Sequence, residues 1–599
     1  MGKKLHVVNE VGQDQAAFFS AQVTAEKRKW YQPRLGFHAW LKKFLPEPII
    51  LLLYALLVGI IGGFGAVGFR RLIALFKSLF FTDVKGAFAP LGHFDVFLLP
   101  VIGLFIVSFM VQYLAPEAKG HGVPEVMAAI AEEGSIIRPR VVVIKAVSSA
   151  LCIGSGGSVG REGPIVQIGS AFGSSLGAYL GLPERYLRLL VGCGAGAGIA
   201  ATFNAPIGGV MFATEVILNS FTLQNFTAVV ISCVAAAGIG RIFFGNHATL
   251  TATVPVSSPH FSYYFIYILV GLLAGLWGFV YIRVLYKIED WFNAIPWPFW
   301  SKAILGGVIV GGIGVAFPQV FGVGYTWVNA AISNHIGLTM MFVLLILKLL
   351  VTSVTIGAGG SGGVFSPGLY QGSMLGGVIG LLVVQIFPHS GLNPGMLAAI
   401  AMAGVFAGSA HAPVTSIIML FEMTGDYKII LPIMIVSVLA ATVTTTMSKE
   451  TIYTLKLVRR GLDFYRLRQP DRMKAITVGD ALATEHLALD ANLTVRQAWK
   501  RFAETNAWFA HVRDEKGVVM GSVARAQVLE TMNQTDGQDT IKMEELLPKT
   551  IHRIDEQATL AEALDKMHTL DVTYLLVVRK QNPIGVIGSS DIIHAYKEE

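Results

Sequence analysis

The chain divides into two stretches that differ in their pattern of hydrophobic and polar positions. From Ile49 to about Leu457 apolar stretches follow one another, and Gly or Pro interrupts many before the roughly 20 residues of a straight membrane span. Such irregular backbone is tolerated at membrane depth only where protein buries it or where it lines a cavity. From about residue 470, short β-branched runs alternate with amphipathic helical patterns. The pattern predicts a bundle of broken membrane helices followed by a soluble α+β tail.

Composition sharpens this division. Only 14% of the 599 residues are charged and 53% are hydrophobic, whereas soluble domains carry about 25% charged residues. The formal net charge of +7 comes from the first stretch, where basic loops fit the positive-inside rule better than nucleic-acid binding. We expect a cytoplasmic N-terminal segment (1–48), a membrane domain (49–460) and a cytoplasmic tail (461–599). The predicted location is the plasma (inner) membrane of a prokaryote, with both termini cytoplasmic.

An internal repeat runs through the membrane domain. Lys145–Pro164 and Lys348–Pro367 lie 203 positions apart and share eight of 20 residues, including the Lys, a glycine cluster and the closing Pro. A second pair, at an offset of 207, places Glu215 eleven residues after Asn204 and Glu422 eleven residues after His411. These pairs predict duplicated halves at about 50–250 and 260–460, with a transport site where they meet.

The tail repeats as well. Leu493–Val512 matches Ala558–Val577 at an offset of 65, and each match precedes a short strand that contains a glycine, Gly521 or Gly585. This predicts two similar α+β units in tandem.

The glycine-rich loops of the repeat suit anion binding. Glycines let backbone N–H groups converge into a concavity, and a helix that begins just after the loop adds its positive N-terminal dipole. Neither loop has the Lys that a nucleotide-binding P-loop requires after its glycines. Nor does a nucleophile–base pair or metal cluster stand near them, so we expect neither an enzyme nor a metal site.

Glu162 is the one carboxylate inside the first loop. A charged group at that depth is a functional candidate, and its carboxylate could occupy the anion site until protonation frees it. The alternative is a structural ion pair with neighbouring Arg161.

Five short motifs carry a family resemblance. They are GHGVPE at Gly120–Glu125, GREGP at Gly160–Pro164, FNAP at Phe203–Pro206, GVFSP at Gly363–Pro367 and EMTGDY at Glu422–Tyr427. In this order and spacing they resemble the CLC chloride channel and transporter family over about residues 48–460. The tail resembles the paired cystathionine-β-synthase-type (CBS) domains that many members carry.

The resemblance implies an all-helical membrane fold with an inverted repeat, assembled as a homodimer with a separate pore in each subunit. By position, Glu162 would be the gating glutamate. The residues that the resemblance places around a central chloride ion are the loop positions His121, Gly160 and Gly363, the backbone amides of Val364 and Phe365, and the hydroxyl of Tyr453.

Two positions depart from the family pattern. His121 stands where the family usually has Ser; its ring could donate an N–H to the anion, or could turn away and bond to backbone. Proton-coupled members tend to carry two adjacent glutamates after FNAP, whereas here Val216 follows Glu215. A valine cannot take a proton. This favours a passive, voltage- or pH-gated chloride channel, with a chloride/proton antiporter as the alternative.

Nucleotide binding by the tail lacks support. Nucleotide-binding CBS pairs usually carry a Ser or Thr and an Asp after the glycine-containing strand, but the first unit has Ala524 and Gln527 there. The second unit keeps Asp591 but has Gly588, followed by Ser589 and Ser590. A tail that stabilises a dimer fits equally well, so we expect no cofactor beyond the permeant chloride.

Overall fold

A computed structural model provides the fold. It describes residues 36–462, apart from 133, 247, 251, 253 and 255–260. In the tail it describes 473, 476–482, 487–505, 507, 509–515, 517, 519–534, 541–547, 552–570, 572, 574–579, 582–589, 591–592 and 595. Positions 1–35 of the predicted N-terminal segment, and Ser590, lie outside the described residues. The chain forms two compact units, Met1–Phe464 and Tyr465–Glu599.

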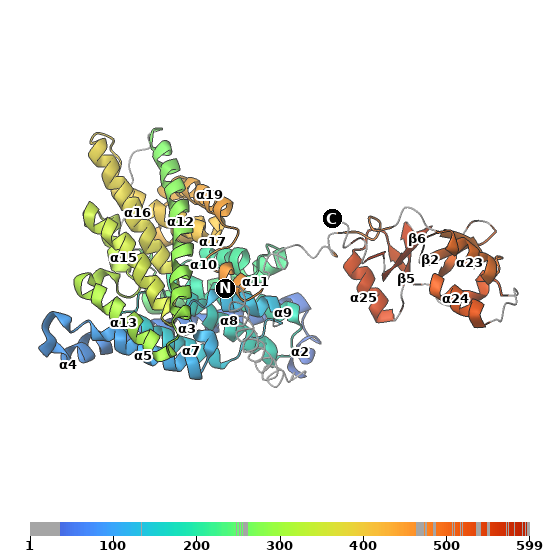
Figure 1. The fold of residues 1–599 in the computed structure, drawn as a ribbon, viewed down its shortest axis with the longest axis horizontal. Helices are drawn as coiled ribbons and strands as arrows, with labels where there is room; N and C mark the ends of the chain where they lie inside the picture. The colour runs from blue at the N-terminus through green and yellow to red at the C-terminus, as the bar shows by residue number, and fades with distance from the viewer. Residues whose placement is uncertain are drawn as a thin grey trace, which may run out of the picture. The chain divides into compact units, whose positions relative to one another are not determined.

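Among the described residues of the first unit, the extended elements of secondary structure are all helices (Figure 1). Its first half contains α2 (Gly36–Leu41), α3 (Glu47–Ser78), η1 (Leu79–Val84), α4 (Lys85–Ala87), η2 (Ala89–Phe94), α5 (Leu98–Tyr113), η3 (Pro116–Ala118), α6 (Val123–Glu132), α7 (Arg140–Gly154), α8 (Glu162–Tyr179), α9 (Glu184–Phe203), α10 (Pro206–Met211), η4 (Phe212–Ile217) and α11 (Leu223–Phe244). Its second half contains α12 (Tyr263–Ala294), α13 (Phe299–Ala316), η5 (Pro318–Val320), α14 (Tyr325–Ile332), α15 (Leu338–Gly357), α16 (Phe365–Ile386), α17 (Pro394–Ala410), α18 (Pro413–Thr424), η6 (Tyr427–Ile429), α19 (Ile430–Met447) and α20 (Thr454–Arg459).

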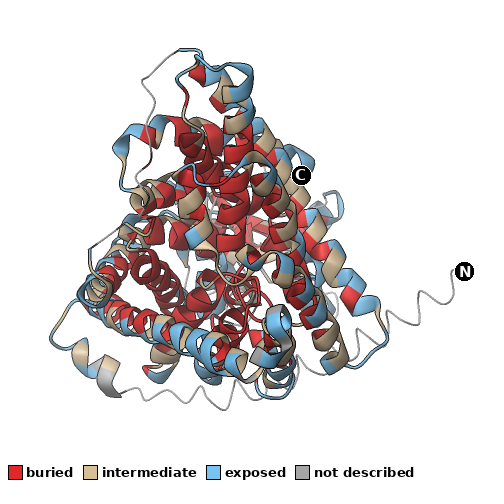
Figure 2. Cartoon of the chain, turned by 90° about the vertical axis from the view of Figure 1, so that its left-hand side faces the viewer, coloured by how far each residue is buried: buried red, intermediate tan, exposed pale blue. Residues whose placement is uncertain are grey.

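Eight of the described helices are long and apolar enough to cross a membrane. Four further apolar stretches, such as α5 and α17, are shorter. Buried residues gather in the interior of this unit, while the outer helices carry exposed ones (Figure 2). Apolar side chains exposed on outer helices, such as Phe64 and Leu269, suit contact with lipid. The chain is a multi-pass integral membrane protein.

The two halves pack in the same way. Helix α8 packs against α9 as α16 packs against α17, and α3 contacts α9 and α11 as α12 contacts α17 and α19. Where the halves meet, the Gly160 N–H donates to the Gly363 carbonyl (2.7 Å) and the Gly363 N–H donates to the Gly160 carbonyl (2.6 Å). A two-fold rotation exchanges two such bonds, as an inverted repeat requires.

The matched lysines of the repeat have equivalent structural roles. Lys145 is fully buried, and its amine donates to the carbonyls of Ala118 (2.9 Å) and Gly120 (2.7 Å). Lys348 is equally buried and donates to Val320 (3.0 Å) and Gly322 (2.8 Å). Each lysine thus fixes the loop before a short helix, α6 or α14, because a buried ammonium must find acceptors. The repeat therefore extends to the loops at 118–120 and 320–322.

The described residues of the tail unit form two three-stranded sheets of the same topology. In each, the first strand pairs parallel to the second, and the second pairs antiparallel to the third. Its elements are β1 (Leu487–Asp490), α23 (Val495–Ala503), β2 (Phe509–Arg513), β3 (Val519–Ala524), α24 (Arg525–Gln534), η7 (Met543–Leu546), β4 (Arg553–Asp555), α25 (Leu560–Leu570), β5 (Tyr574–Arg579) and β6 (Asn582–Gly588).

The tail repeat of the sequence is visible in the strand register. Val512 pairs with Gly521 in the first sheet, and Val577 pairs with Gly585 in the second. Thr494 and Thr559 hold equivalent positions before α23 and α25, and each accepts a hydrogen bond from the backbone three residues on. The predicted fold class, a helical membrane domain with an internal repeat and an α+β tail, is confirmed.

Candidate functional site

Three loops that lie far apart in the sequence meet at the centre of the membrane unit. Besides the Gly160–Gly363 pair, the Gly120 N–H donates to the Gly360 carbonyl (3.0 Å), so the GHGVPE loop joins the other two motifs. Helix α6 begins at Val123, α8 at Glu162 and α16 at Phe365. Three helix N-termini therefore converge, each with N–H groups that have no partner within their own helix.

Glycine is required where the loops cross. A Cβ on Gly363 would lie 2.7 Å from the Gly163 nitrogen, so a side chain there would force the two backbones apart. A Cβ on Gly160 would collide with the Glu162 carboxylate. These two glycines thus bring the helices α8 and α16 together and leave room for the acidic side chain.

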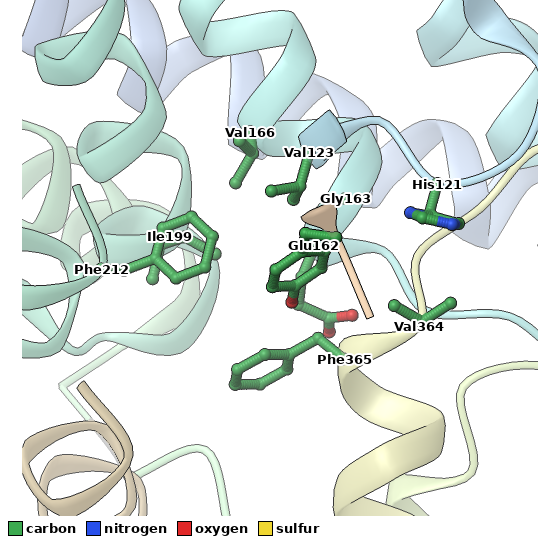
Figure 3. A pocket seen from close by; sticks show the side chains of 10 residues that line it. His121, Val123, Glu162, Gly163, Val166, Ile199, Phe212, Val364 and Phe365 are labelled. Atoms are coloured by element: carbon green, nitrogen blue, oxygen red, sulfur yellow. The ribbon is translucent and has the colours of Figure 1, made fainter. Parts of the chain in front are cut away.

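A cavity lies between these helix N-termini (Figure 3). One side is apolar, with Ile199 and Phe212, and the other carries His121 and Val364. The residues that line it are His121, Val123, Glu162, Gly163, Val166, Ile199, Phe212, Val364, Phe365 and Tyr453. The structure therefore brings together every residue that the sequence assigned to gating or chloride binding, with Gly160 and Gly363 forming the adjacent backbone pair.

The Glu162 side chain is 1% exposed and reaches toward the start of α16 (Figure 3). Its carboxylate accepts hydrogen bonds from the Ser366 hydroxyl, the Ser366 N–H (3.3 Å) and the Tyr325 hydroxyl (3.3 Å). The nearest nitrogen of Arg161 is 3.9 Å away, and its guanidinium lies over the Tyr325 ring, 5.3 Å from the centroid. Hydrogen bonds hold this carboxylate more directly than the ion pair that the sequence left open.

Ser366 and Tyr325 are site residues that the sequence reasoning missed. Ser366 stands inside the GVFSP motif, so its hydroxyl could have been recognised. Tyr325 opens α14, and its hydroxyl lies 2.9 Å from the Ser366 hydroxyl. Tyr325 could have been found by extending the internal repeat. An offset of 202 relates Gly120 of the GHGVPE loop to Gly322, and Tyr325 follows Gly322 by three residues.

On the opposite side of the site, aromatic side chains surround His121. Its ring is 6.1 Å from that of Tyr286 and 6.4 Å from that of Tyr453, measured between centroids. His121 Nε2 lies 3.3 Å from the Tyr286 hydroxyl. The ring is therefore bonded to a side chain, not to the backbone, and it remains on the cavity wall.

Glu215 and Glu422 do not line the cavity. The Glu215 carboxylate accepts from the backbone N–H groups of Val414 (3.2 Å) and Thr415 (2.6 Å) at the start of α18. Glu422 accepts from those of Ile207 (3.1 Å) and Gly208 (2.6 Å) at the start of α10. Each half thus caps a helix of the other half, which explains the second repeat pair. Val216 is buried beside Glu215 in η4.

In the tail, the positions considered for a nucleotide have local partners. The Asp591 carboxylate accepts from the Gly588 N–H (2.8 Å), and the Gln527 amide donates to the Leu546 carbonyl (3.0 Å). Ala524 ends β3.

Comparisons with known proteins agree with this geometry. The family model for the voltage gated chloride channel matches residues 103–445, and that for the CBS domain matches residues 544–598. The chain is 31% identical over 434 residues to an H(+)/Cl(-) exchange transporter, ClcA, of Vibrio cholerae serotype O1 (strain M66-2), covering 71% of this chain and 92% of that protein. It is 30% identical to a putative chloride channel protein, ClcB-like, of Ralstonia nicotianae, covering 70% and 99%.

Among solved structures, the chain is similar to a slow cyanobacterial Cl-/H+ antiporter. The TM-score is 0.64 at 26% sequence identity, over 69% of this chain and 98% of that one.

These comparisons contradict the prediction of a passive chloride channel, because the similar proteins include a named exchange transporter and a solved antiporter. The prediction was wrong because it let Val216 decide the mechanism. A valine removes one proton acceptor, but a proton can cross along any chain of hydrogen-bonding groups, including other side chains that line the cavity.

Proposed function

The chain belongs to the voltage-gated chloride channel family, and we propose that it exchanges chloride for protons through the central cavity. The family matches indicate transport rather than catalysis. The similarity to a named exchange transporter and a solved antiporter favours coupled exchange.

One observation carries the proposal: a buried carboxylate lies in a cavity built to attract an anion. The N-termini of α6, α8 and α16 direct their positive dipole ends to this region. These partial charges suit reversible binding, because a full cation would hold the ion too tightly for release. The carboxylate of Glu162 is the only acidic side chain among the described residues that line the cavity.

In the proposed cycle, Glu162 and chloride compete for the same donors. The ionised carboxylate accepts from Ser366 and Tyr325 and blocks the passage. Protonation removes its charge, so the side chain loses its attraction to the helix N-termini and gives way to chloride. Chloride would then contact the amides of Val364 and Phe365 and the hydroxyl of Tyr453. Because the same group carries the proton and admits the anion, the two movements are linked.

We further propose the setting in which exchange takes place. The basic loops of the membrane unit favour cytoplasmic termini by the positive-inside rule, in the inner membrane of a prokaryote. We also propose that the protein is a homodimer with one anion pathway in each subunit, as the family resemblance implies. The mass of the purified protein in detergent, 64.5 kDa for one chain, distinguishes a dimer from a monomer.

Chloride efflux from liposomes across a range of pH tests the role of Glu162. Wild-type protein should transport faster as the pH falls, whereas Glu162→Gln, which mimics the protonated carboxyl, should give a flux that hardly depends on pH. Glu184→Gln, which neutralises an exposed carboxylate at the start of α9, is the matched control and should behave as wild type. Wild-type pH dependence in Glu162→Gln would refute the gating role.

A further inference from the structure

His121 forms part of the cavity wall at a point where its protonation state matters. The side chain is 1% exposed and lines the same cavity as Glu162 and Tyr453. Figure 3 shows its ring above Val364, on the side opposite Ile199 and Phe212.

The Tyr286 hydroxyl fixes which ring nitrogen of His121 carries the hydrogen. This hydroxyl donates its single hydrogen to the Ile452 carbonyl, at 2.7 Å. It can therefore only accept from His121 Nε2, which lies 3.3 Å away. In the neutral ring, Nε2 thus holds the hydrogen and Nδ1 presents a lone pair.

Nδ1 of His121 is buried and has no hydrogen-bond partner among the described residues. Buried polar atoms of native proteins are usually paired, so an unpaired ring nitrogen on a residue that lines the cavity is a candidate partner for a bound ion. A bare lone pair repels an anion, whereas a protonated Nδ1 donates to it.

Burial and the charged groups around the ring decide when it can take a proton. Burial opposes an imidazolium most strongly, Lys145, Lys456 and Arg460 oppose it as well, and Glu125 favours it. Glu125 is itself paired with Lys456 (3.0 Å) and with both terminal nitrogens of Arg460 (2.8 and 2.7 Å). The remaining titratable neighbours are the phenols of Tyr286 and Tyr453, on α12 and just before α20, and Glu162 across the cavity. A bound anion would compensate the charge of an imidazolium.

We propose that His121 is a proton-dependent ligand of the central anion: its Nδ1 takes up one proton as a small inorganic anion such as chloride enters, and releases it when the anion leaves. The inference rests on the proposed function, because it assumes that chloride occupies this cavity. It gives the cavity a second side chain, besides Glu162, that is proposed to carry a proton, in a chain where Val216 supplies none. A serine at this position could donate a hydrogen bond but could not take up a proton.

Chloride binding to purified Glu162→Gln protein tests the proposal, since this background removes the only carboxylate among the described residues that line the cavity. Calorimetric titration across pH 6 to 8 should show the Kd rising about tenfold per pH unit, because each chloride brings one proton. Titrations at one pH in two buffers of different ionisation enthalpy should report about one proton taken up per chloride. In Glu162→Gln/His121→Asn, whose amide donates without titrating, the Kd should not change with pH.

Two tyrosine variants distinguish the effect of the His121 tautomer from a general loss of chloride binding. Tyr286→Phe removes the acceptor of Nε2–H, so the neutral ring can move its hydrogen to Nδ1 and bind chloride without a proton. The pH dependence of Kd should therefore become shallower in Glu162→Gln/Tyr286→Phe. In Glu162→Gln/Tyr453→Phe, chloride binding should weaken while the pH dependence stays, because among the described residues no hydrogen bond joins this hydroxyl to the His121 ring.

A chloride Kd that is independent of pH in Glu162→Gln would overturn the inference, as would an equal slope in the His121→Asn variant. The binding experiment needs no transport. If liposomes show no coupled exchange while binding still takes up a proton through His121, the proposed function fails and this inference stands. If exchange is observed and binding takes up no proton, the proposed function stands and this inference fails.

Discussion

The two halves of the membrane unit place different side chains at equivalent points. Glu162 opens α8 and Phe365, 203 positions later, opens α16. Ser366, whose hydroxyl donates to Glu162, is equivalent to Gly163. Both helices start beside the reciprocal Gly160–Gly363 hydrogen bonds. The backbone is therefore duplicated, whereas the acidic group and its donor are not.

The loops that face these helices differ in the same sense. Helix α14 begins with Tyr325, whose hydroxyl reaches Glu162, and the equivalent α6 begins with Val123. His121 corresponds to Val323. In contrast, Lys145 and Lys348 are buried alike and bind equivalent carbonyls. The packing that both copies of the repeat share builds the scaffold, whereas the side chains proposed to handle the proton and the anion lie at its asymmetric positions.

The largest expected effect comes from removing the two glutamates that cap helices equivalently in the two halves. Glu215→Ala removes the acceptor of two N–H groups and of the Thr415 hydroxyl, and Glu422→Ala removes that of two N–H groups. Each should lower the free energy of unfolding by about 2 kcal/mol, with Glu215→Ala the more severe, because N–H groups at a helix start lose their carboxylate partner. Thermal unfolding in detergent measures the effect, with the Gln variants as conservative controls. If only one of the two Ala variants lost stability, the two glutamates would not be equivalent helix caps.

Tyr325→Phe tests the asymmetric part. Its hydroxyl donates to the Glu162 carboxylate, which is proposed to block the passage, so its removal leaves that carboxylate with one donor fewer. Chloride flux should therefore increase at high pH, where the wild-type protein is expected to transport slowest. The phenylalanine keeps the ring beneath Arg161.

The matched control for this variant is Tyr370→Phe. That hydroxyl donates to the Gln319 carbonyl at 3.5 Å and is not among the donors to Glu162, so its loss should leave the pH profile unchanged. An unchanged profile in Tyr325→Phe would show that the hydroxyl does not hold the carboxylate.

A smaller difference is expected between two equivalent serines where the halves meet. The Ser361 hydroxyl donates to the Ala118 carbonyl (2.7 Å) and is contacted by the Ser149 hydroxyl (2.8 Å). The Ser158 hydroxyl has one contact, with Thr352 at 3.3 Å. Ser361→Ala should therefore cost about 1 kcal/mol and Ser158→Ala about half of that. Tm values that fall in the opposite order would contradict this ranking.

Much of the scaffold could be predicted from the sequence. The offset of 203 identified the glycine pair and the buried lysines, because close backbone contact and buried charge tolerate few residue types. The grouping of His121, Glu162, Val364, Phe365 and Tyr453 followed from the family resemblance, and the structure places all five on one cavity. Their roles in gating and anion binding stay predictions.

Other features could not be predicted because they depend on contacts across the two halves. Glu215 and Glu422 each cap a helix about 200 positions away, which is apparent only once the inverted arrangement is known. The Tyr325 contact with Glu162 joins one half to the other in the same way. Which ring nitrogen of His121 carries the hydrogen follows from the contacts of Tyr286 with His121 and Ile452, and no local sequence pattern predicts these contacts. The mechanism was predicted wrongly because one position, Val216, was given the weight of a whole pathway.

The most direct test of coupled exchange is proton movement against its gradient in liposomes that contain the purified chain. An imposed chloride gradient, with no initial pH difference and with the membrane potential clamped, should drive protons in the direction opposite to chloride at a fixed ratio. Glu162→Gln should abolish this proton movement while chloride still flows. Chloride flux without any proton transport in the wild-type protein would contradict coupled exchange.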